Sequence, residues 1–172
     1  MSTDDLRVTP VSRLPLRAQL VGELLRLGRH RASMAEVEEV FVVGAPFEAE
    51  RRILWDAFKA YRSVALAHYP SARFWVNGGF VTHKTWAAPH DIDVCVVVPG
   101  AEVLAVGQAG EHLWTTPGPP RIQPMAGLVD GFLAVAEMLD DLNYWRSMWT
   151  SVTDSDGTAD PGRRKGYLEV EP

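Results

Sequence analysis

The segment from Asp91 to Val98 constrains the fold of this chain more than any other part of the sequence. Its residues read DIDVCVVV, are mostly β-branched and almost continuously apolar after the first three, and are closed by Pro99-Gly100. A strand that is apolar on both faces is typical of the centre of a sheet that is covered on both sides. The segment therefore predicts a central strand in an α/β protein.

Apolar spacing and capping residues predict the elements around this strand. Leucines at helical spacing predict a helix over residues 16–27, and Ser33 with Glu36 forms a capping box that starts a short helix. A longer helix is expected over residues 46–68, with Arg51 among the charged residues on its polar side. Further strands are expected over residues 73–77, 128–135 and 166–170, and further helices over residues 101–114 and 138–149.

Composition places the chain among ordinary globular proteins. Its 172 residues suffice for a buried core, and 47% hydrophobic with 23% charged residues argues against disorder or a fibre. Nothing approaches the ~18 consecutive apolar residues of a membrane span, and the first residues lack the pattern of a signal peptide. The single cysteine, Cys95, excludes a disulfide scaffold and favours a reducing compartment. We therefore expect a cytoplasmic protein with no membrane partner.

Charge is distributed unevenly along the chain. The formal net charge of −5 argues against a general nucleic-acid binder. Residues 1–32 hold six arginines against three acidic residues, so this segment carries +3 and the remainder carries −8. This difference predicts a basic N-terminal lead-in and helix over residues 1–32, which either contacts phosphate or presents a solvated helix face, and a main domain over residues 33–172.

Paired carboxylates open the predicted central strand. Strand side chains alternate, so Asp91 and Asp93 project to the same face. Two carboxylates on a buried strand repel one another unless a cation neutralises them, and oxygen ligands of this kind suit Mg²⁺ or Mn²⁺. Gly78 and Gly79 end the preceding strand and offer amides that phosphate oxygens can approach closely. Each motif alone is typical of an exposed strand edge or a turn, but together they predict a nucleotide site.

Three further residues are candidates for the same site. Asp130 lies within the apolar strand expected over residues 128–135, and is either the third carboxylate of a two-metal site or a polar residue of a turn. Lys84 and Lys165 are either neutralisers of triphosphate charge or solvated lysines. We assign metal binding and catalysis to Asp91, Asp93 and Asp130, and nucleotide binding to Gly78, Gly79, Lys84 and Lys165.

The same residues carry a resemblance to a known family. Asn77-Gly78-Gly79-Phe80, followed by Asp91-Ile92-Asp93-Val94, resembles the Gly-Gly/Ser and Asp-x-Asp signature of the polymerase-β-like nucleotidyltransferase superfamily. More narrowly, the stretch from Val76 to Val98 is similar to the core of a bacterial and phage family of small uncharacterised proteins of this fold, and the likeness covers roughly residues 28–170. Many active members have Ser where this chain has Gly79.

The resemblance implies both a fold and an activity. It implies a mixed central sheet flanked by helices, a nucleotidyltransferase-like domain over residues 33–172, a divalent metal on Asp91 and Asp93, and an NTP substrate. The expected enzyme moves a nucleotidyl group from the NTP to a tRNA, a protein or a small molecule, as in toxin–antitoxin or phage-defence systems. Because the chain is short, a homodimer or a partner protein is expected to supply the acceptor site.

A second interpretation belongs to a different functional class. A catalytically degenerate module that binds a nucleotide or a partner protein would keep the same fold and the same carboxylates. Gly79 and the small size favour this module, whereas the complete set of Asp91, Asp93 and Asp130 favours the enzyme. Turnover of NTP separates the two, because both would bind it with magnesium.

Overall fold

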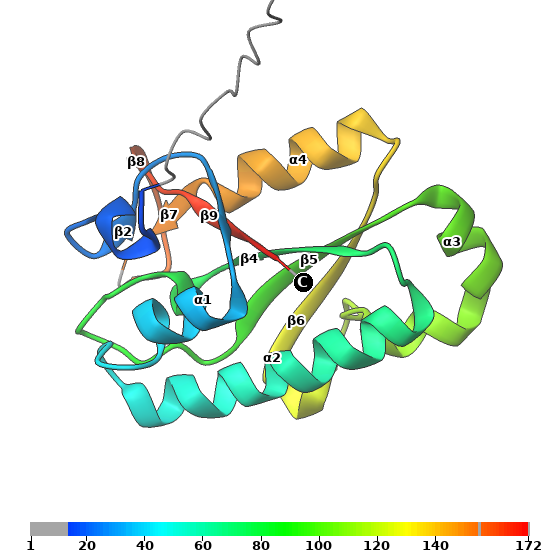
Figure 1. Ribbon diagram of the computed structural model, residues 1–172, viewed down its shortest axis with the longest axis horizontal. Helices are drawn as coiled ribbons and strands as arrows, with labels where there is room; N and C mark the ends of the chain where they lie inside the picture. Colours follow the sequence, from blue (N-terminus) through cyan, green and yellow to red (C-terminus); the bar gives the residue numbers. More distant parts are fainter. Residues whose placement is uncertain (1–13, 155, 172) are drawn as a thin grey trace, which may run out of the picture.

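The computed structural model describes residues 14–154 and 156–171, and a five-stranded mixed sheet forms its centre (Figure 1). Two strand pairs are parallel, β3 with β9 and β5 with β6, whereas β4 runs antiparallel to both of its neighbours. The strands lie in the order β3 (Arg29–Ala32), β9 (Tyr167–Val170), β4 (Arg73–Asn77), β5 (Ile92–Val98) and β6 (Val129–Val135). The expected mixed sheet is confirmed, with the Asp91–Val98 segment inside it.

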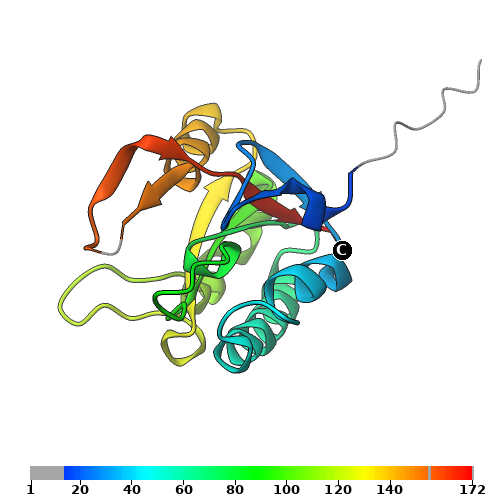
Figure 2. The ribbon, with the colours of Figure 1, turned by 90° about the vertical axis from the view of Figure 1, so that its left-hand side faces the viewer.

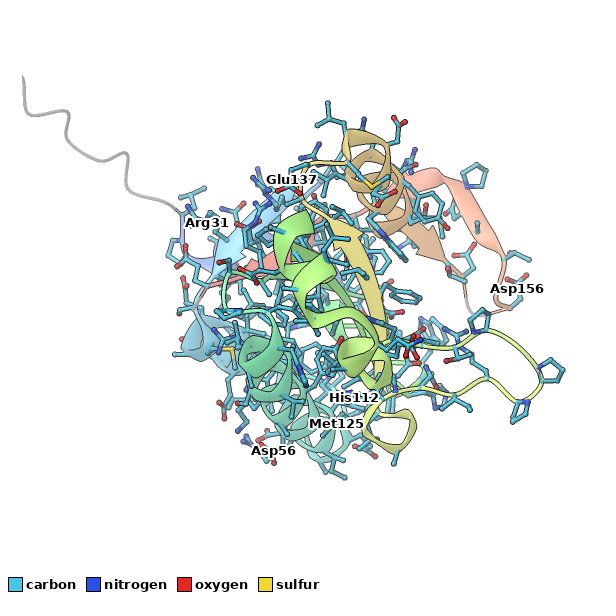
Figure 3. All side chains as sticks on the ribbon, turned by 90° about the vertical axis from the view of Figure 1, so that its right-hand side faces the viewer. Arg31, Asp56, His112, Met125, Glu137 and Asp156 are labelled. Atoms are coloured by element: carbon cyan, nitrogen blue, oxygen red, sulfur yellow. The ribbon has the colours of Figure 1, made fainter. Side chains whose placement is uncertain are left out.

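Helices cover both faces of the sheet, as expected. α1 (Met34–Phe41) and α2 (Glu48–His68) pack on one face, and α4 (Leu139–Trp149) packs on the other (Figures 1 and 2). α1 begins at the predicted capping box, in which the Ser33 hydroxyl accepts a hydrogen bond from the Glu36 amide. Figure 3 views the molecule from the other end, with α4 above the sheet and α2 below it. No helix in the described part of the chain is long and apolar enough to cross a membrane.

The side chains of β5 alternate between two hydrophobic cores, one on each face of the sheet. Ile92, Val94, Val96 and Val98 point toward α1 and α2, where a large cluster of buried residues includes Phe58 and Tyr61. Cys95 and Val97 point toward α4, where a smaller cluster includes Trp75 and Trp149. Asp93 shares the α4 face with Cys95, because side chains two apart on a strand lie on the same side. The two-sided burial predicted for this strand is therefore confirmed.

Short elements complete the described chain. Two small antiparallel pairs lie outside the main sheet, β1 (Leu20–Val21) with β2 (Leu24–Leu25) and β7 (Ser151–Thr153) with β8 (Ala159–Arg164). α3 (Gly100–Val106) follows β5. The 3-10 helices are η1 (Leu16–Gln19), η2 (Gly79–Val81), η3 (Gly107–Leu113) and η4 (Met125–Gly127).

The N-terminal segment differs from its prediction. The helix expected over residues 16–27 is wrong, because Gly22 adopts a left-handed φ of +60° and the chain turns back from β1 into β2. The leucine spacing misled because Leu16 lies in the 3-10 helix η1, Leu20 and Leu24 lie in two strands, and Leu27 is exposed, so these leucines do not share one helix face. Residues 29–32 form β3, so this stretch is an edge strand of the central sheet.

The helix expected over residues 101–114 is shorter than predicted. α3 ends at Val106, because Gly107 adopts a left-handed φ of +53°, and the chain continues as the 3-10 helix η3. Glycine takes this conformation without a steric penalty, which makes it a natural helix end.

Arg51 also lies where the helical pattern did not place it. The side chain is fully buried, and its guanidinium donates hydrogen bonds to the carbonyl oxygens of Pro46, Phe41, Phe80 and Thr82 at 2.6–3.1 Å. Burial lowers its pKa to about 10, so the group remains charged at neutral pH. Four carbonyl acceptors make the buried charge tolerable, and the contacts tie α1 and α2 to the segment that follows Gly79.

Replacing Arg51 is expected to destabilise the protein strongly. Arg51→Met keeps the apolar stem but leaves buried carbonyl groups without donors, which is expected to lower the free energy of unfolding by about 3 kcal/mol. The control is Arg52→Met, because Arg52 forms only surface ion pairs with Glu38 and Glu48 and its loss should matter far less. Urea unfolding followed by far-UV circular dichroism measures the free energy of unfolding of both variants. Equal losses of stability in the two variants would contradict the structural role of Arg51.

Candidate functional site

Strand register brings the predicted carboxylates together at one end of the sheet. In β5, Asp93 pairs with Asn77 of β4 on one side and with Asp130 of β6 on the other. The three side chains therefore stand in a row on the face covered by α4. Asp91 immediately precedes the first residue of β5, and its charge acts on Asp93. The expectation that Asp130 lies on the strand next to Asp93 is confirmed.

Asp93 is the most perturbed acid of this group. Burial, and then the charges of Asp91 and Asp130, raise its pKa to about 7, whereas Lys165 and Arg121 act in the opposite direction. A carboxyl with this pKa is poised between its neutral and ionised forms near neutral pH. This raised pKa is the effect that burial and neighbouring acids have on a carboxyl group of a strand.

The other two carboxylates already have partners from the loop over residues 115–123. Arg121 forms an ion pair with Asp130, and the Thr115 hydroxyl donates a hydrogen bond of 2.5 Å to the same carboxylate. Gln123 donates to Asp91 at 3.0 Å. In the described residues no three His, Cys, Asp or Glu side chains converge as a metal-binding group, so the metal set of Asp91, Asp93 and Asp130 stays a prediction.

The glycine turn, Gly78 and Gly79, faces Asp93 directly. Gly78 has a left-handed φ of +75°, and a Cβ atom there would collide with the Asp93 carboxylate. Gly79 is roomier, because a Cβ atom would stand 3.1 Å from Lys84 Nζ. The close approach of backbone to carboxylate explains why the first position must be glycine.

Two lysines lie at the glycine turn. Lys165 is 5% exposed, its ammonium donates a hydrogen bond of 2.8 Å to the Gly78 carbonyl, and burial lowers its pKa to about 8. Burial also lowers the pKa of Lys84, whose ammonium lies 4.5 Å from the ring centre of Trp86. Both predicted lysines are therefore partly desolvated cations next to the backbone of the turn.

A cavity of about 650 Å³, the site cavity, joins most of the predicted residues. Gly78, Gly79, Lys84, Asp93 and Lys165 all line it. Asp91 and Asp130 lie beside Asp93 but are not part of its lining. The volume is within the usual range for small-molecule sites, which is about 300–1,000 Å³.

Several residues of the site have no clear signal in the sequence. Asn77 is buried, donates to the Trp149 carbonyl at 2.7 Å, and within the described residues its Oδ1 atom has no hydrogen-bond partner. The end of α4 and the β7–β8 hairpin supply another wall of the cavity, and Figure 2 faces this end of the sheet. Arg121 and Gln123 come from a proline-rich segment that reads only as a loop. Asn77 precedes the glycine motif, which is the one local signal among them.

Comparisons with known proteins place the chain in a family without adding an activity. No curated protein and no solved structure matches it. A family model described as a family of unknown function (DUF6932) matches residues 21–171. This match includes the glycine turn, the three aspartates and both lysines of the site. The chain therefore belongs to the DUF6932 family.

Proposed function

We propose that this protein is a metal-dependent nucleotidyltransferase of the polymerase-β-like type. The observation that carries the proposal is the position of Asp93, a carboxylate with a raised pKa that lies between two further carboxylates and against the glycine turn. A site cavity with two lysines opens from this point. Acidic groups that need a cation, next to amides and ammonium groups that suit phosphate, favour a metal-bound nucleotide as the ligand.

The phosphate-binding role falls to the glycine turn and the lysines. Amides without a neighbouring Cβ atom allow phosphate oxygens to approach closely. Lys84 and Lys165 supply positive charge from two different segments, and the low exposure of Lys165 strengthens its electrostatic effect. These four residues hold and orient the triphosphate in the proposed complex.

The carboxylates fit a divalent cation by their chemistry. Asp91 and Asp93 offer oxygen ligands of the kind that Mg²⁺ and Mn²⁺ prefer, and burial followed by the charges of Asp91 and Asp130 raises the pKa of Asp93. A bound magnesium ion would neutralise triphosphate charge and hold the phosphates in position.

Asp130 takes the proton of the acceptor hydroxyl in this proposal. A general base must reach that hydroxyl directly or through one water molecule. Arg121 now occupies one oxygen of Asp130, but its side chain is 53% exposed and belongs to a surface loop. Loop side chains move readily, so Arg121 can turn away when the acceptor binds.

The Arg121–Asp130 ion pair also favours the second candidate function. If Arg121 remained in place, Asp130 would serve as a structural anion, and the protein would bind a nucleotide without transferring it. Gly79, which lacks the hydroxyl common in active superfamily members, favours the same degenerate module. Turnover is the property that separates the two candidates.

Turnover is expected to require all three aspartates. With α-labelled NTPs, Mg²⁺ or Mn²⁺ and cell lysate, wild type should transfer label to a macromolecule or a small product. Asp91→Asn and Asp93→Asn remove ligand charge and should lower transfer at least about 100-fold. Asp130→Asn should keep Mg²⁺–NTP affinity but lose about 100-fold or more in transfer, because only the base is removed.

The control for these variants is Asp56→Asn, which changes an exposed acid of α2 that pairs with Lys59 and should leave transfer unchanged. Binding of Mg²⁺–NTP without any transfer by wild type would favour the degenerate module. Absence of both binding and transfer would reject the proposed function.

The stability of the metal-free protein is expected to fall as the pH rises. The pKa of Asp93, about 7 in the fold, exceeds the value of about 3.9 in an unfolded chain, so the folded state binds this proton more tightly. The resulting stabilisation is complete below about pH 4 and is lost as the pH rises through about 7. Urea unfolding with a chelator should show Asp93→Asn more stable than wild type at about pH 8. A less stable variant would mean that the ionised carboxylate supports the fold.

A serine at the second glycine is expected to fit and to strengthen binding. The backbone of Gly79 is not left-handed, and the new Cβ atom would meet only the flexible end of Lys84 at 3.1 Å. Gly79→Ser adds a hydroxyl donor for phosphate, worth about 1 kcal/mol or roughly fivefold in Mg²⁺–NTP affinity. Gly78→Ala, which collides with Asp93, is the contrasting variant and should lose both stability and binding. Equal damage in the two variants would contradict the assigned roles of the turn.

A further inference from the structure

The site cavity has further lining residues that the phosphate-binding role does not explain. They include the apolar residues Leu24 of β2, Met148 and Trp149 at the end of α4, and Val152 of β7, beside the ion-paired residues Glu23, Asp154 and Arg163. Trp86, from the loop before β5, also lines it. A cavity of about 650 Å³ that is lined by both charged and apolar residues fits a ligand with an anionic part and a flat apolar part.

Trp86 is the exposed one among the tryptophans of the described residues. It is 52% exposed, although tryptophan is a residue that proteins mostly bury, whereas Trp55 and Trp75 are fully buried. Its indole ring lies under the Lys84 ammonium at 4.5 Å. The same ammonium lies 3.1 Å from the place where a Cβ atom on Gly79 would stand. Lys84 therefore connects the ring to the glycine turn.

The loop that carries Trp86 is attached to the fold before it reaches this residue. Thr82 forms a strand-like bridge with Leu24, and the His83 amide donates to the Glu23 carbonyl at 2.8 Å. The Thr82 hydroxyl donates to the Gly79 carbonyl at 2.8 Å. The Arg51 guanidinium donates hydrogen bonds to the Phe80 and Thr82 carbonyl oxygens. An exposed aromatic ring on an anchored loop is preorganised for stacking, because little conformational entropy is lost when a ligand binds to it.

We propose that Trp86 is the stacking platform for the base of the nucleotide whose phosphates lie at Gly78 and Gly79. The inference rests on the proposed function and deepens it, because it assigns a place for the base in the same cavity. A nucleobase is flat and presents a π-face, which is the surface that an exposed indole ring stacks against.

Lys84 links the two halves of this ligand. A phosphate at the glycine turn offers the ammonium a charge-assisted hydrogen bond, which is stronger than its contact with the exposed ring. The ammonium would then turn from the indole toward the phosphate and uncover the ring for the base. Phosphate binding and base stacking are thereby coupled through one side chain.

The platform also determines what kind of selectivity the base subsite has. Stacking tolerates every base, because each has a π-face, whereas reading one base requires hydrogen-bonding groups at its edge. Trp86 contacts Lys84 through the face of its ring. A ring face carries no hydrogen-bonding group that could distinguish one base from another. We therefore expect the four NTPs to depend on Trp86 to a similar degree.

The test compares ligands with and without a base on the full chain. Isothermal titration calorimetry with Mg²⁺ measures the affinity for inorganic tripolyphosphate and for ATP, GTP, CTP and UTP. Trp86→Ala should weaken each NTP about 5- to 100-fold, the range that stacking on one aromatic side chain contributes, and leave tripolyphosphate unchanged. Trp86→Phe should retain most of the NTP affinity. Tyr144→Ala removes an exposed aromatic residue of α4 outside the cavity lining. It should change neither the NTP affinity nor the tripolyphosphate affinity.

Each other outcome overturns the inference in a recognisable way. Equal weakening of tripolyphosphate and NTPs by Trp86→Ala would mean that the ring acts only through Lys84 or the glycine turn. Unchanged NTP affinity would mean that the base lies elsewhere, while the proposed nucleotide site stands. Wild type that binds neither ligand would reject the proposed function together with the platform. Thermal melting of the variants shows whether the fold is intact.

Discussion

The charge of Asp93 is the constraint on which the arrangement of this site depends. The residue lies in the central strand, between Asp130 of β6 and the turn that ends β4, and Asp91 is nearby. Negative charge at this depth requires compensation. The glycine at position 78 leaves space for the carboxylate, Lys165 brings an ammonium to the turn, and Arg121 neutralises Asp130. Residues distant in the sequence thus meet because one strand begins with acids.

Arg51 fixes the backbone next to this site by hydrogen bonds. Its guanidinium joins the end of α1 and the start of α2 to the segment after the glycine turn through hydrogen bonds to carbonyl groups. Buried polar groups must be hydrogen-bonded, so these carbonyl groups and the charged side chain hold one another in a single geometry. The position of the glycine turn relative to β5 is therefore set by the core rather than by the loop. A site that must place amides accurately benefits from such support.

The local patterns of the sequence predicted the parts of the fold that depend on local physics. The capping box of α1, the apolar β5 and the Gly78–Gly79 turn follow from neighbouring residues, and all are present. The missed features depend on long-range contacts. β3 pairs with the last strand of the chain, Arg51 is satisfied by carbonyl groups up to 31 positions away, and Arg121 reaches Asp130 from a proline-rich loop. Helical periodicity cannot reveal a buried arginine, because charged residues are assigned to the outer face by default.

Balanced charges at the site have a consequence for how it would bind its ligands. Three carboxylates (Asp91, Asp93 and Asp130) lie close to three cationic side chains (Lys84, Arg121 and Lys165). A free metal ion is attracted by the acids but repelled by the cationic side chains. A free triphosphate is attracted by the cationic side chains but repelled by the acids. A metal and a triphosphate that arrive together satisfy both sets, so each should raise the affinity for the other, and this coupling is reciprocal by thermodynamic linkage. The Arg121–Asp130 ion pair and the nearby Lys165 ammonium then act as internal substitutes for that ligand, because they give the carboxylates positive charge of the kind that a divalent cation would supply. This balance explains how a strand with two acids at its start is accommodated in the fold itself.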